Sequence, residues 1–596
     1  MRYLPSLTCA ILLFCCTSFV AVAADDMPAD AWIFSGQSNM KAIGGEAQSA
    51  VGEVVEKHGH GYFPIYVAEP GKPIEAWLDP QHRDYGKLWK PLEAKIKQAR
   101  GAGHRFRGFV WYQGESDVNA EAGKYQQQLA ELVRRLRDLT GQKDLPAIIV
   151  QIGAATSYDG RDWAVGVVRE AQRRFAAEDE NAAVVAAIDA EVGDYTVHMS
   201  KRGAQTVAAR IAAAADRLAY GNEQVHWGPQ FEAAYFLDDE HKLVVVAFDQ
   251  VKDKLQLHDG WLAGFGASAE SRLPKNLSDL EDTEVMGRLV DDYVYPVGGT
   301  LLNNHSLILK FPSPLPDNAR LSYAAARNAQ YGPHRRWGLE FGGLRDGSGH
   351  QAPAFVLVPI AEKNATFTVP KIPEVLGVAE DWRQIAVNCV GRYPQAVTAP
   401  EAKAGAEQEG WRQAYWNPAS AGTTPNLIDN RGRVTPVGFH TGVWYMSPYF
   451  RELKDGDDAL MASWCKNKVH EFVGLEAGEK YDLAIYLLQG PPKQSDARPA
   501  HLPVRVRVLH IAPRQKRRDA TAVVEQVVQV PASGTFERYQ VATPSSEAKG
   551  NVLLLEAVPA DDHGKITLAI EIGQSKGDSV KWGDTTLAGV QIRRRP

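Results

Sequence analysis

The sequence predicts an α/β domain with three layers (α/β/α) built on a mostly parallel sheet, followed by two β-sandwich domains. Two features of the 596-residue chain predict this order. Up to about residue 220, short apolar runs alternate with segments of helical periodicity, which implies crossover connections between parallel strands. Beyond that point, short apolar runs are separated by Gly, Pro, Asn and Asp turns, which is typical of β-sandwiches.

The first domain is expected to contain buried strands, each a continuous apolar run. They lie at residues 31–34, 62–68, 109–112, 148–152 and 184–188. Helices are expected at residues 125–139, 163–177 and 204–218. In the first of these helices, apolar side chains recur at spacings of three and four residues, which places them on one face.

The two sandwich domains are separated by a polar stretch at residues 399–410. This stretch is rich in Ala, Glu and Lys and has few large apolar residues, so it is the expected linker. The expected domains are therefore residues 25–220, 221–398 and 411–596. Sandwich strands are expected at residues 242–248, 306–311, 355–359, 365–369, 481–488, 502–511 and 523–530.

The first 24 residues have the pattern of a signal peptide. Arg2 precedes an apolar stretch at residues 4–20, and residues 21–23 are Ala-Val-Ala, the small-x-small form that a signal peptidase cleaves. We expect cleavage near Ala23 or Ala24 and a secreted or periplasmic protein with no later membrane contact. A lipid anchor at Cys15 or Cys16 is less favoured, because Phe14 is bulky where such signals carry a small residue.

Charge and cysteine content exclude some classes of partner. The formal net charge of −6 provides no basic field for nucleic acid or an anionic membrane. The basic clusters at residues 514–518 and 593–595 are short and are expected to be solvated. Cys389 and Cys465 remain after signal cleavage, and both a disulfide and two buried thiols are compatible with export.

The segment that indicates catalysis is residues 32–40, Trp-Ile-Phe-Ser-Gly-Gln-Ser-Asn-Met. A buried strand leads into a turn of small residues and delivers Ser38 at its carboxyl end, where ligands bind in open α/β sheets. Gly-x-Ser alone also fits an ordinary β-turn. The full string Gly-Gln-Ser-Asn-Met is far more specific.

Three further blocks follow in order. Residues 71–77 are Gly-Lys-Pro-Ile-Glu-Ala-Trp, residues 111–117 are Trp-Tyr-Gln-Gly-Glu-Ser-Asp, and residues 197–203 are Val-His-Met-Ser-Lys-Arg-Gly. Together the blocks resemble the sialate O-acetylesterase-like group, related to carbohydrate esterase family six, of the SGNH (GDSL) hydrolases. That group usually has Gly-Thr-Pro-Ile-Glu-x-Trp in its second block and Trp-Tyr-Gln-Gly-Glu-Ser-Asn in its third. The resemblance is strong over residues 28–218 and fainter over residues 221–370.

The resemblance implies a carboxylic ester hydrolase that removes O-acetyl groups from sialic acids or polysaccharides, like sialate O-acetylesterases and acetylxylan esterases. Ser38 is the implied nucleophile and His198 its base, since a serine hydroxyl must lose its proton to attack. The implied oxyanion hole consists of the backbone N–H groups of Ser38 and Gly71 and the side-chain amide of Gln113. Gln113 could instead satisfy a neighbouring loop. Glu115 is expected to support the site by hydrogen bonding, and a purely structural Glu115 is nearly as well supported.

The chain departs from the family at the acid of the triad. The usual carboxylate lies three residues before the His, and that position is Tyr195. We assign the role to Asp194, with Asp189 and Glu191 as more distant alternatives. A Ser–His dyad assisted by a backbone carbonyl is a further alternative.

Other features favour no cofactor. His58-Gly59-His60 could bind a metal, but a polar surface loop is the better interpretation because no third ligand is near in sequence. No Gly-rich phosphate loop precedes a helix. Tryptophans late in the chain could stack on sugars, although such residues are more often core: Trp411, Trp416, Trp444, Trp464 and Trp582. The rival functions are an esterase for other short-chain esters and a secreted carbohydrate-binding protein whose hydrolase domain has decayed.

Overall fold

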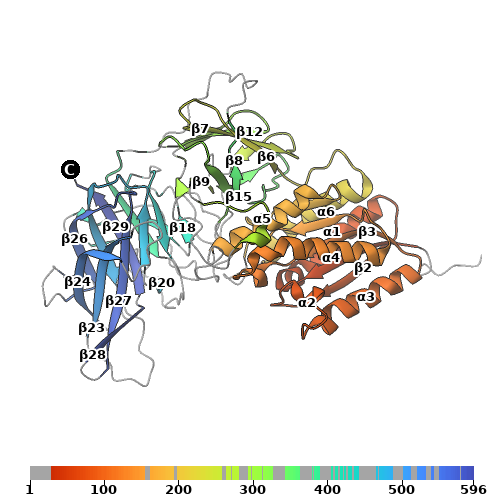
Figure 1. Cartoon of the computed structure of the whole chain (residues 1–596), viewed down its shortest axis with the longest axis horizontal. Coiled ribbons are helices and arrows are strands. Elements are labelled where there is room, and N and C mark those ends of the chain that lie inside the picture. Colours follow the sequence, from red (N-terminus) through yellow and green to blue (C-terminus); the bar gives the residue numbers. More distant parts are fainter. Residues whose placement is uncertain are drawn as a thin grey trace, which may run out of the picture.

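The computed structural model shows an α/β domain and two β-sandwiches, in the chain order that the sequence predicts (Figure 1). It describes residues 28–595 with gaps, and the expected signal peptide lies outside the described residues. The gaps are residues 155–161, 193–196, 258–263, 270, 281–292, 295, 297, 312, 326–342, 363–378, 380, 390–404, 407–409, 414–415, 420–421, 425–426, 428, 432–434, 442–464, 467–468, 488–500, 512–519, 532–538, 543–548, 577–578 and 585.

A parallel sheet of order β2-β1-β3-β4-β5 forms the centre of the first domain. Strands β1, β4 and β5 are buried along their whole length and β3 from Gly108 onward, whereas β2 at the edge is mostly half-buried. Burial of the inner strands on both faces is expected for a sheet covered by helices on two sides. The expected three-layer fold is therefore confirmed. The strands are β1 (Asp30–Gly36), β2 (Tyr62–Ala68), β3 (Arg105–Tyr112), β4 (Ala147–Val150) and β5 (Ala182–Val185).

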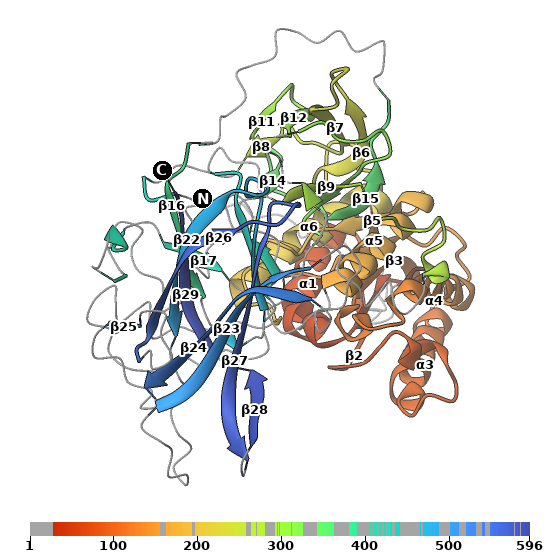
Figure 2. The same cartoon turned by 60° about the vertical axis from the view of Figure 1, so that its left-hand side comes forward.

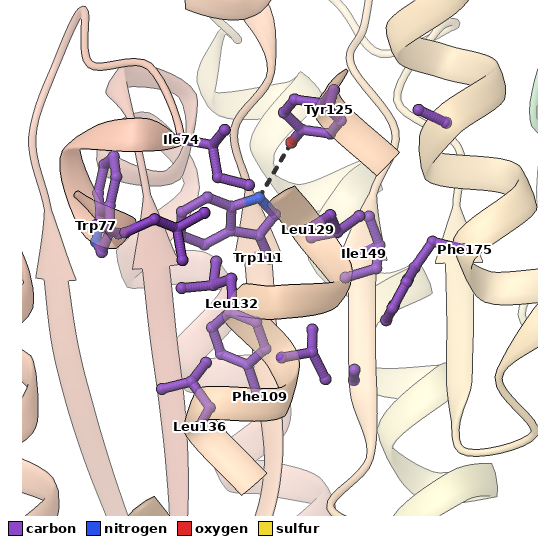
Figure 3. Packing of buried hydrophobic residues seen from close by; sticks show 14 of the residues in the cluster. Ile74, Trp77, Phe109, Trp111, Tyr125, Leu129, Leu132, Leu136, Ile149 and Phe175 are labelled. Carbon is purple, nitrogen blue, oxygen red and sulfur yellow. Dashed lines mark hydrogen bonds between the residues drawn. The ribbon is translucent and has the colours of Figure 1, made fainter. Parts of the chain in front are cut away.

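Alternate side chains of β1 point to opposite layers of helices. Trp32 and Phe34 lie in one apolar cluster with residues of α1 and α6, whereas Ile33 lies in a second cluster with residues of α3, α4 and α5. Figure 3 shows part of this second cluster, in which the Trp111 indole donates a hydrogen bond of 3.2 Å to the Tyr125 hydroxyl. The helices are α1 (Ser38–Lys57), α2 (Glu75–Leu78), α3 (Tyr85–Gly101), α4 (Tyr125–Thr140), α5 (Asp162–Glu178) and α6 (Lys201–Tyr220).

The first sandwich consists of two four-stranded sheets of order β10-β9-β13-β15 and β11-β12-β7-β6, with the small β14-β8 pair beside them. The expected strand at residues 365–369 lies outside the described residues. The strands are β6 (Gln230–Phe236), β7 (Leu243–Asp249), β8 (Gln256–Leu257), β9 (Phe265–Ser268), β10 (Tyr293–Val294), β11 (Gly298–Leu301), β12 (Ser306–Lys310), β13 (Arg320–Tyr323), β14 (Leu344–Arg345) and β15 (Phe355–Pro359).

This sandwich packs directly on the α/β domain, with β15 beside α5 in both views (Figures 1 and 2). Gln151 exchanges two hydrogen bonds with the backbone of Ala354, at 2.7 and 2.9 Å. Ile188, just beyond β5, belongs to the sandwich core. Because these groups are buried, each lost partner would cost about 1–3 kcal/mol, so the two domains form one packed unit.

The C-terminal sandwich includes residues on both sides of the expected linker. β16 (Gln384–Cys389) precedes residue 399, yet it pairs with β29 (Thr586–Arg594) at the end of the chain. β20 (Cys465–Lys466) pairs with β29 as well, so the backbones of Cys389 and Cys465 lie in one sheet. The other strands are β17 (Trp416–Ala419), β18 (Gly422–Thr424), β19 (Gly438–Thr441), β21 (Val469–Val473), β22 (Lys480–Leu487), β23 (His501–His510), β24 (Thr521–Pro531), β25 (Val541–Ala542), β26 (Val552–Pro559), β27 (Ile566–Lys576) and β28 (Ser579–Asp584).

Two of the late tryptophans are core residues. Trp411 and Trp416 belong to one buried cluster of the C-terminal sandwich, and Arg593 covers the Trp411 ring at 4.4 Å. These two rings are therefore not sugar platforms. The side chains of Trp444, Trp464 and Trp582 lie outside the description. Within the described part of the chain, no helix is long and apolar enough to span a membrane.

Candidate active site

Ser38 is the first residue of α1 and follows directly on the carboxyl end of β1. The turn between them depends on Gly36, which has φ 149°, and a Cβ there would collide with the carbonyl oxygen of Tyr112. Gln37 caps α1 through its backbone, and its side chain makes no cap bond. The first N–H groups of a helix have no partner in a preceding turn, and the helix dipole makes this end positive. Ser38 is half-buried at a helix end that favours developing negative charge.

Gln37 links the turn before Ser38 to the third block. Its side-chain oxygen accepts hydrogen bonds from the Gln113 amide at 3.1 Å and the Ser116 N–H at 3.2 Å. The backbone N–H of Gln37 donates to the carbonyl of Tyr112 at 3.0 Å. Gln37 is 3% exposed. Gln37 is thus a buried residue that connects the ends of β1 and β3.

Gln113 has no exposed surface. Its side-chain amide donates to the carbonyl of Lys72 at 3.1 Å, to Gln37 and to the carboxylate of Asp117, and its side-chain oxygen accepts from Tyr125 at 3.1 Å. An amide has only two N–H hydrogens, so these three acceptors use both. This geometry fits the alternative in which Gln113 satisfies neighbouring loops, and its oxyanion role stays a prediction.

Gly71 is an exposed residue of the second block. It has φ +67°, and a Cβ there would meet no atom within 4 Å. The glycine is therefore required by backbone conformation rather than by space. The neighbouring Lys72 carbonyl accepts from Gln113, which brings this block to the third one.

Asp117 is a buried carboxyl at the end of the short 3-10 helix Glu115–Asp117. Its two oxygens accept from the backbone N–H of Ile74, both at 3.2 Å, and one accepts from Gln113. Burial raises the pKa of Asp117 to about 7, opposed by these hydrogen bonds and reinforced by the charges of Glu115 and Glu75. Asp117 occupies the position at which the family usually has Asn.

Asn39 joins α1 to the loop that carries His198. Its side-chain N–H groups donate to Glu115 Oε1 at 2.5 Å and to the carbonyl of Val197 at 3.0 Å. Its side-chain oxygen accepts from the backbone N–H of Met199 at 3.1 Å. Asn39, which directly follows Ser38 in the chain, therefore binds the residues on both sides of His198.

Glu115 lies close enough to His198 for the histidine charge to lower its pKa, against the larger rise caused by burial. Its Oε1 accepts from Asn39. Its Oε2 is buried and has no hydrogen-bond partner among the described residues. Glu115 is thus a buried carboxyl beside the expected base.

The other predicted acids differ in their surroundings. Asp189 is held by Arg210 at 2.6 and 2.8 Å and by Arg345 of the first sandwich at 3.2 Å, so both of its oxygens are occupied. Glu191 is exposed. Asp194 lies outside the described residues.

Sequence reasoning missed the roles of Gln37, Asn39 and Asp117. The signal was present as polar residues in alternation: 37 and 39 flank Ser38, and 113, 115 and 117 alternate with smaller residues. All five of these polar side chains are buried in the structure. Asn39 lies in α1 and residues 115–117 form a 3-10 helix, so the alternation of strand side chains does not explain this burial.

The described residues contain no group of three or more His, Cys, Asp or Glu that could hold a metal ion. In the His58-Gly59-His60 segment, His58 contacts Asp216 at 2.6 Å and stacks on Tyr220. The ring of His60 bonds to Arg105 at 3.0 Å. Both imidazoles thus have contacts that support the structural interpretation.

Residues 53–217 match the family described as carbohydrate esterase, sialic acid-specific acetylesterase. This match lies within the α/β domain. It begins after Ser38 and includes the second, third and His blocks. A comparison with curated proteins found no match.

Solved structures similar to this chain include a carbohydrate acetylesterase of Xanthomonas citri, at 19% identity over 55% of this chain and 80% of that one, with a TM-score of 0.41. A protein of Arabidopsis thaliana is 20% identical over 32% of this chain and 98% of its own, with a TM-score of 0.27. A GDSL-like lipase of Bacteroides thetaiotaomicron is 14% identical over 32% and 88%, with a TM-score of 0.21.

Replacement of Asp117 by Asn, the usual family residue, should stabilise the protein at neutral pH. The folded state holds the Asp117 proton up to about pH 7, whereas the unfolded chain releases it near the ordinary value of 3.8. The free energy of unfolding of the parent therefore falls as pH rises through this window, and that of Asp117→Asn does not. The gap between the two free energies should reach up to about 4 kcal/mol. Urea unfolding at pH 4 to 8 measures the gap.

Asp84→Asn is the control with the opposite sign, because the hydrogen bond from Lys72 lowers the pKa of Asp84. Its stabilising charge is lost only as pH falls below the ordinary Asp value. A constant gap between parent and Asp117→Asn from pH 4 to 8 would contradict the account of Asp117.

Proposed function

We propose that this protein is a secreted serine esterase that removes O-acetyl groups from carbohydrates through an acyl-serine intermediate. The observation that carries the proposal is the position of Ser38, which opens α1 at the carboxyl end of the parallel sheet while its neighbours hold the His198 loop and the third block. The esterase family of residues 53–217 supports the chemistry.

In the proposed reaction, His198 takes the proton of the Ser38 hydroxyl as its oxygen attacks the acetyl carbon. The carbonyl oxygen becomes negative, and the N–H groups of Ser38 and Gly71 stabilise it, each donor contributing roughly 10²–10³ in rate. His198 then gives the proton to the leaving sugar oxygen. Water, deprotonated by His198, then attacks the acetyl-serine, which releases acetate and restores the Ser38 hydroxyl.

We propose Glu115 as the acid that serves His198, in competition with Asp194. The support for Glu115 is its burial, its electrostatic contact with His198 and an Oε2 atom without a partner among the described residues. A carboxylate there would stabilise the imidazolium that forms during attack. The sequence support for Asp194 is its place near His198 in the chain.

The substrate class is proposed as acetylated sialic acids or polysaccharides. Acetate release from acetylated sialic acids, xylan, pectin and sulfated algal polymers would discriminate among them, and preference for simple aryl esters over all of these would favour the rival esterase. Export is proposed from the small-x-small segment at residues 21–23. N-terminal sequencing of the exported protein checks it, and an intact Met1 would overturn it.

Ser38→Ala should leave the fold intact and abolish turnover. The side chain is half-buried at a helix end, so packing loss is small, while loss of the nucleophile leaves only the contribution of the oxyanion hole and binding. We expect a fall in kcat on the order of 10³ or more, measured as acetate release by protein with parental circular dichroism. Near-parental turnover would refute the serine mechanism.

Glu115→Gln and Asp194→Asn, measured side by side, should separate the two candidate acids. If Glu115 serves His198, Glu115→Gln lowers kcat by up to about 10⁴, while Asp194→Asn stays within tenfold of the parent. Glu191→Gln is the matched control, since Glu191 is exposed. The reverse order of the two losses would assign the role to Asp194, and small losses in both would indicate a dyad.

A further inference from the structure

We propose that Asn39 is the positioning residue that fixes His198 relative to Ser38 and keeps Glu115 beside both. The inference rests on the proposed function, because it concerns the geometry of the same nucleophile and base. Asn39 makes no contact with the reacting atoms in this account. It acts through the backbone of the His198 loop and through Glu115.

The hydrogen-bond partners of Asn39 fit an amide side chain. Asn39 donates to two acceptors, Glu115 Oε1 and the carbonyl of Val197, and accepts from one donor, the N–H of Met199. An amide offers two N–H donors on one atom and an acceptor on the other, so a single orientation of the Asn39 side chain satisfies all three. A carboxylate, a hydroxyl or an apolar residue of similar size cannot make this set.

The two backbone bonds of Asn39 lie on either side of His198. Val197 and Met199 flank His198, so the two backbone bonds fix the loop on both sides of the base. Met199 is further held by an antiparallel bridge to Val192. Because Asn39 is the second residue of α1 and Ser38 the first, the anchor of the base and the nucleophile share one rigid helical turn.

Asn39 has no exposed surface. Water therefore does not replace a lost partner there, and an unpaired buried polar group costs about 1–3 kcal/mol of stability. The His198 loop is thus held in one arrangement by bonds that solvent cannot exchange. A displacement of about 1 Å between catalytic groups can lower turnover by about 10²-fold.

The test compares Asn39→Ala and Asn39→Asp with the parent on an aryl acetate, with kcat and KM measured from pH 5 to 9. Asn39→Ala should lower kcat by about 10²-fold or more and change KM less than about threefold. Asn39→Asp keeps an acceptor for Met199 but loses both N–H donations and adds a charge beside Glu115. It should lower kcat similarly and move the acid limb of kcat/KM to higher pH, because a like charge raises the pKa of Glu115.

Gln48→Ala is the matched control on the same helix, since among the described residues the Gln48 side chain bonds within α1, to the Gly44 carbonyl at 2.8 Å. It should keep parental kcat. Two results would overturn the inference: folded Asn39→Ala with kcat within threefold of the parent, or an Asn39→Asp profile with an unmoved acid limb. Full activity in Ser38→Ala would instead reject the proposed function, and the inference with it.

Discussion

A buried network of hydrogen bonds between side chains at the ends of β1 and β3 is the constraint on which the site depends. Gln37 and Asn39 enter it from the nucleophile turn, and Gln113 and Glu115 enter it from the third block. Main-chain groups of the second block and of the His198 loop complete it. The blocks are separated along the sequence, and no apolar contact could align them with comparable directionality.

The arrangement also explains why Ser38 alone among its immediate neighbours is accessible. Gln37 and Asn39 are buried while Ser38 is half-buried. Gly36 allows the sharp turn that brings the hydroxyl to the helix end. If Ser38 is the nucleophile, as proposed, this fixed position would lower the barrier to attack, because little rearrangement would be needed.

Glu115 and Asp117 are two buried carboxyls only two residues apart. Burial raises the pKa of each, and the charge of Glu115 contributes to the rise at Asp117. Ionisation of a buried carboxyl lowers the free energy of unfolding of the protein. Clusters of this kind are typical of functional sites. The two carboxyls have different partners. Asn39 hydrogen-bonds both to Glu115 and to the His198 loop, whereas Asp117 accepts from the N–H of Ile74 in the second block.

Much of the fold could be predicted because the strands of a covered parallel sheet are uninterrupted apolar runs, as in Trp32 to Phe34. Helix α1 was harder to predict because Gly44 and Gly52 weaken its pattern. Both glycines allow close approach to Tyr66 and Tyr62 of β2, where a Cβ would lie 2.8 and 3.0 Å from the rings. Packing thus overrides propensity here.

The sequence predicts Ser38 and His198 as reactive residues from local motifs, and these roles stay predictions. The side-chain and backbone partners that hold their segments together could not be predicted, because the fold brings them together from distant parts of the chain. The Val197 carbonyl lies 158 residues from Asn39. Asp189 could not be separated from the other acids by sequence, because its partner Arg345 belongs to another domain.

The central claim is that Ser38 is the activated nucleophile of this site. The most direct measurement is to react the protein with a serine-directed fluorophosphonate and locate the adduct by peptide mass spectrometry. The account predicts one adduct, on the peptide that contains Ser38, formed much more slowly when His198 is replaced by Ala, because the serine then lacks the base that takes its proton. Absence of the adduct, or its attachment to a different serine, would contradict the account.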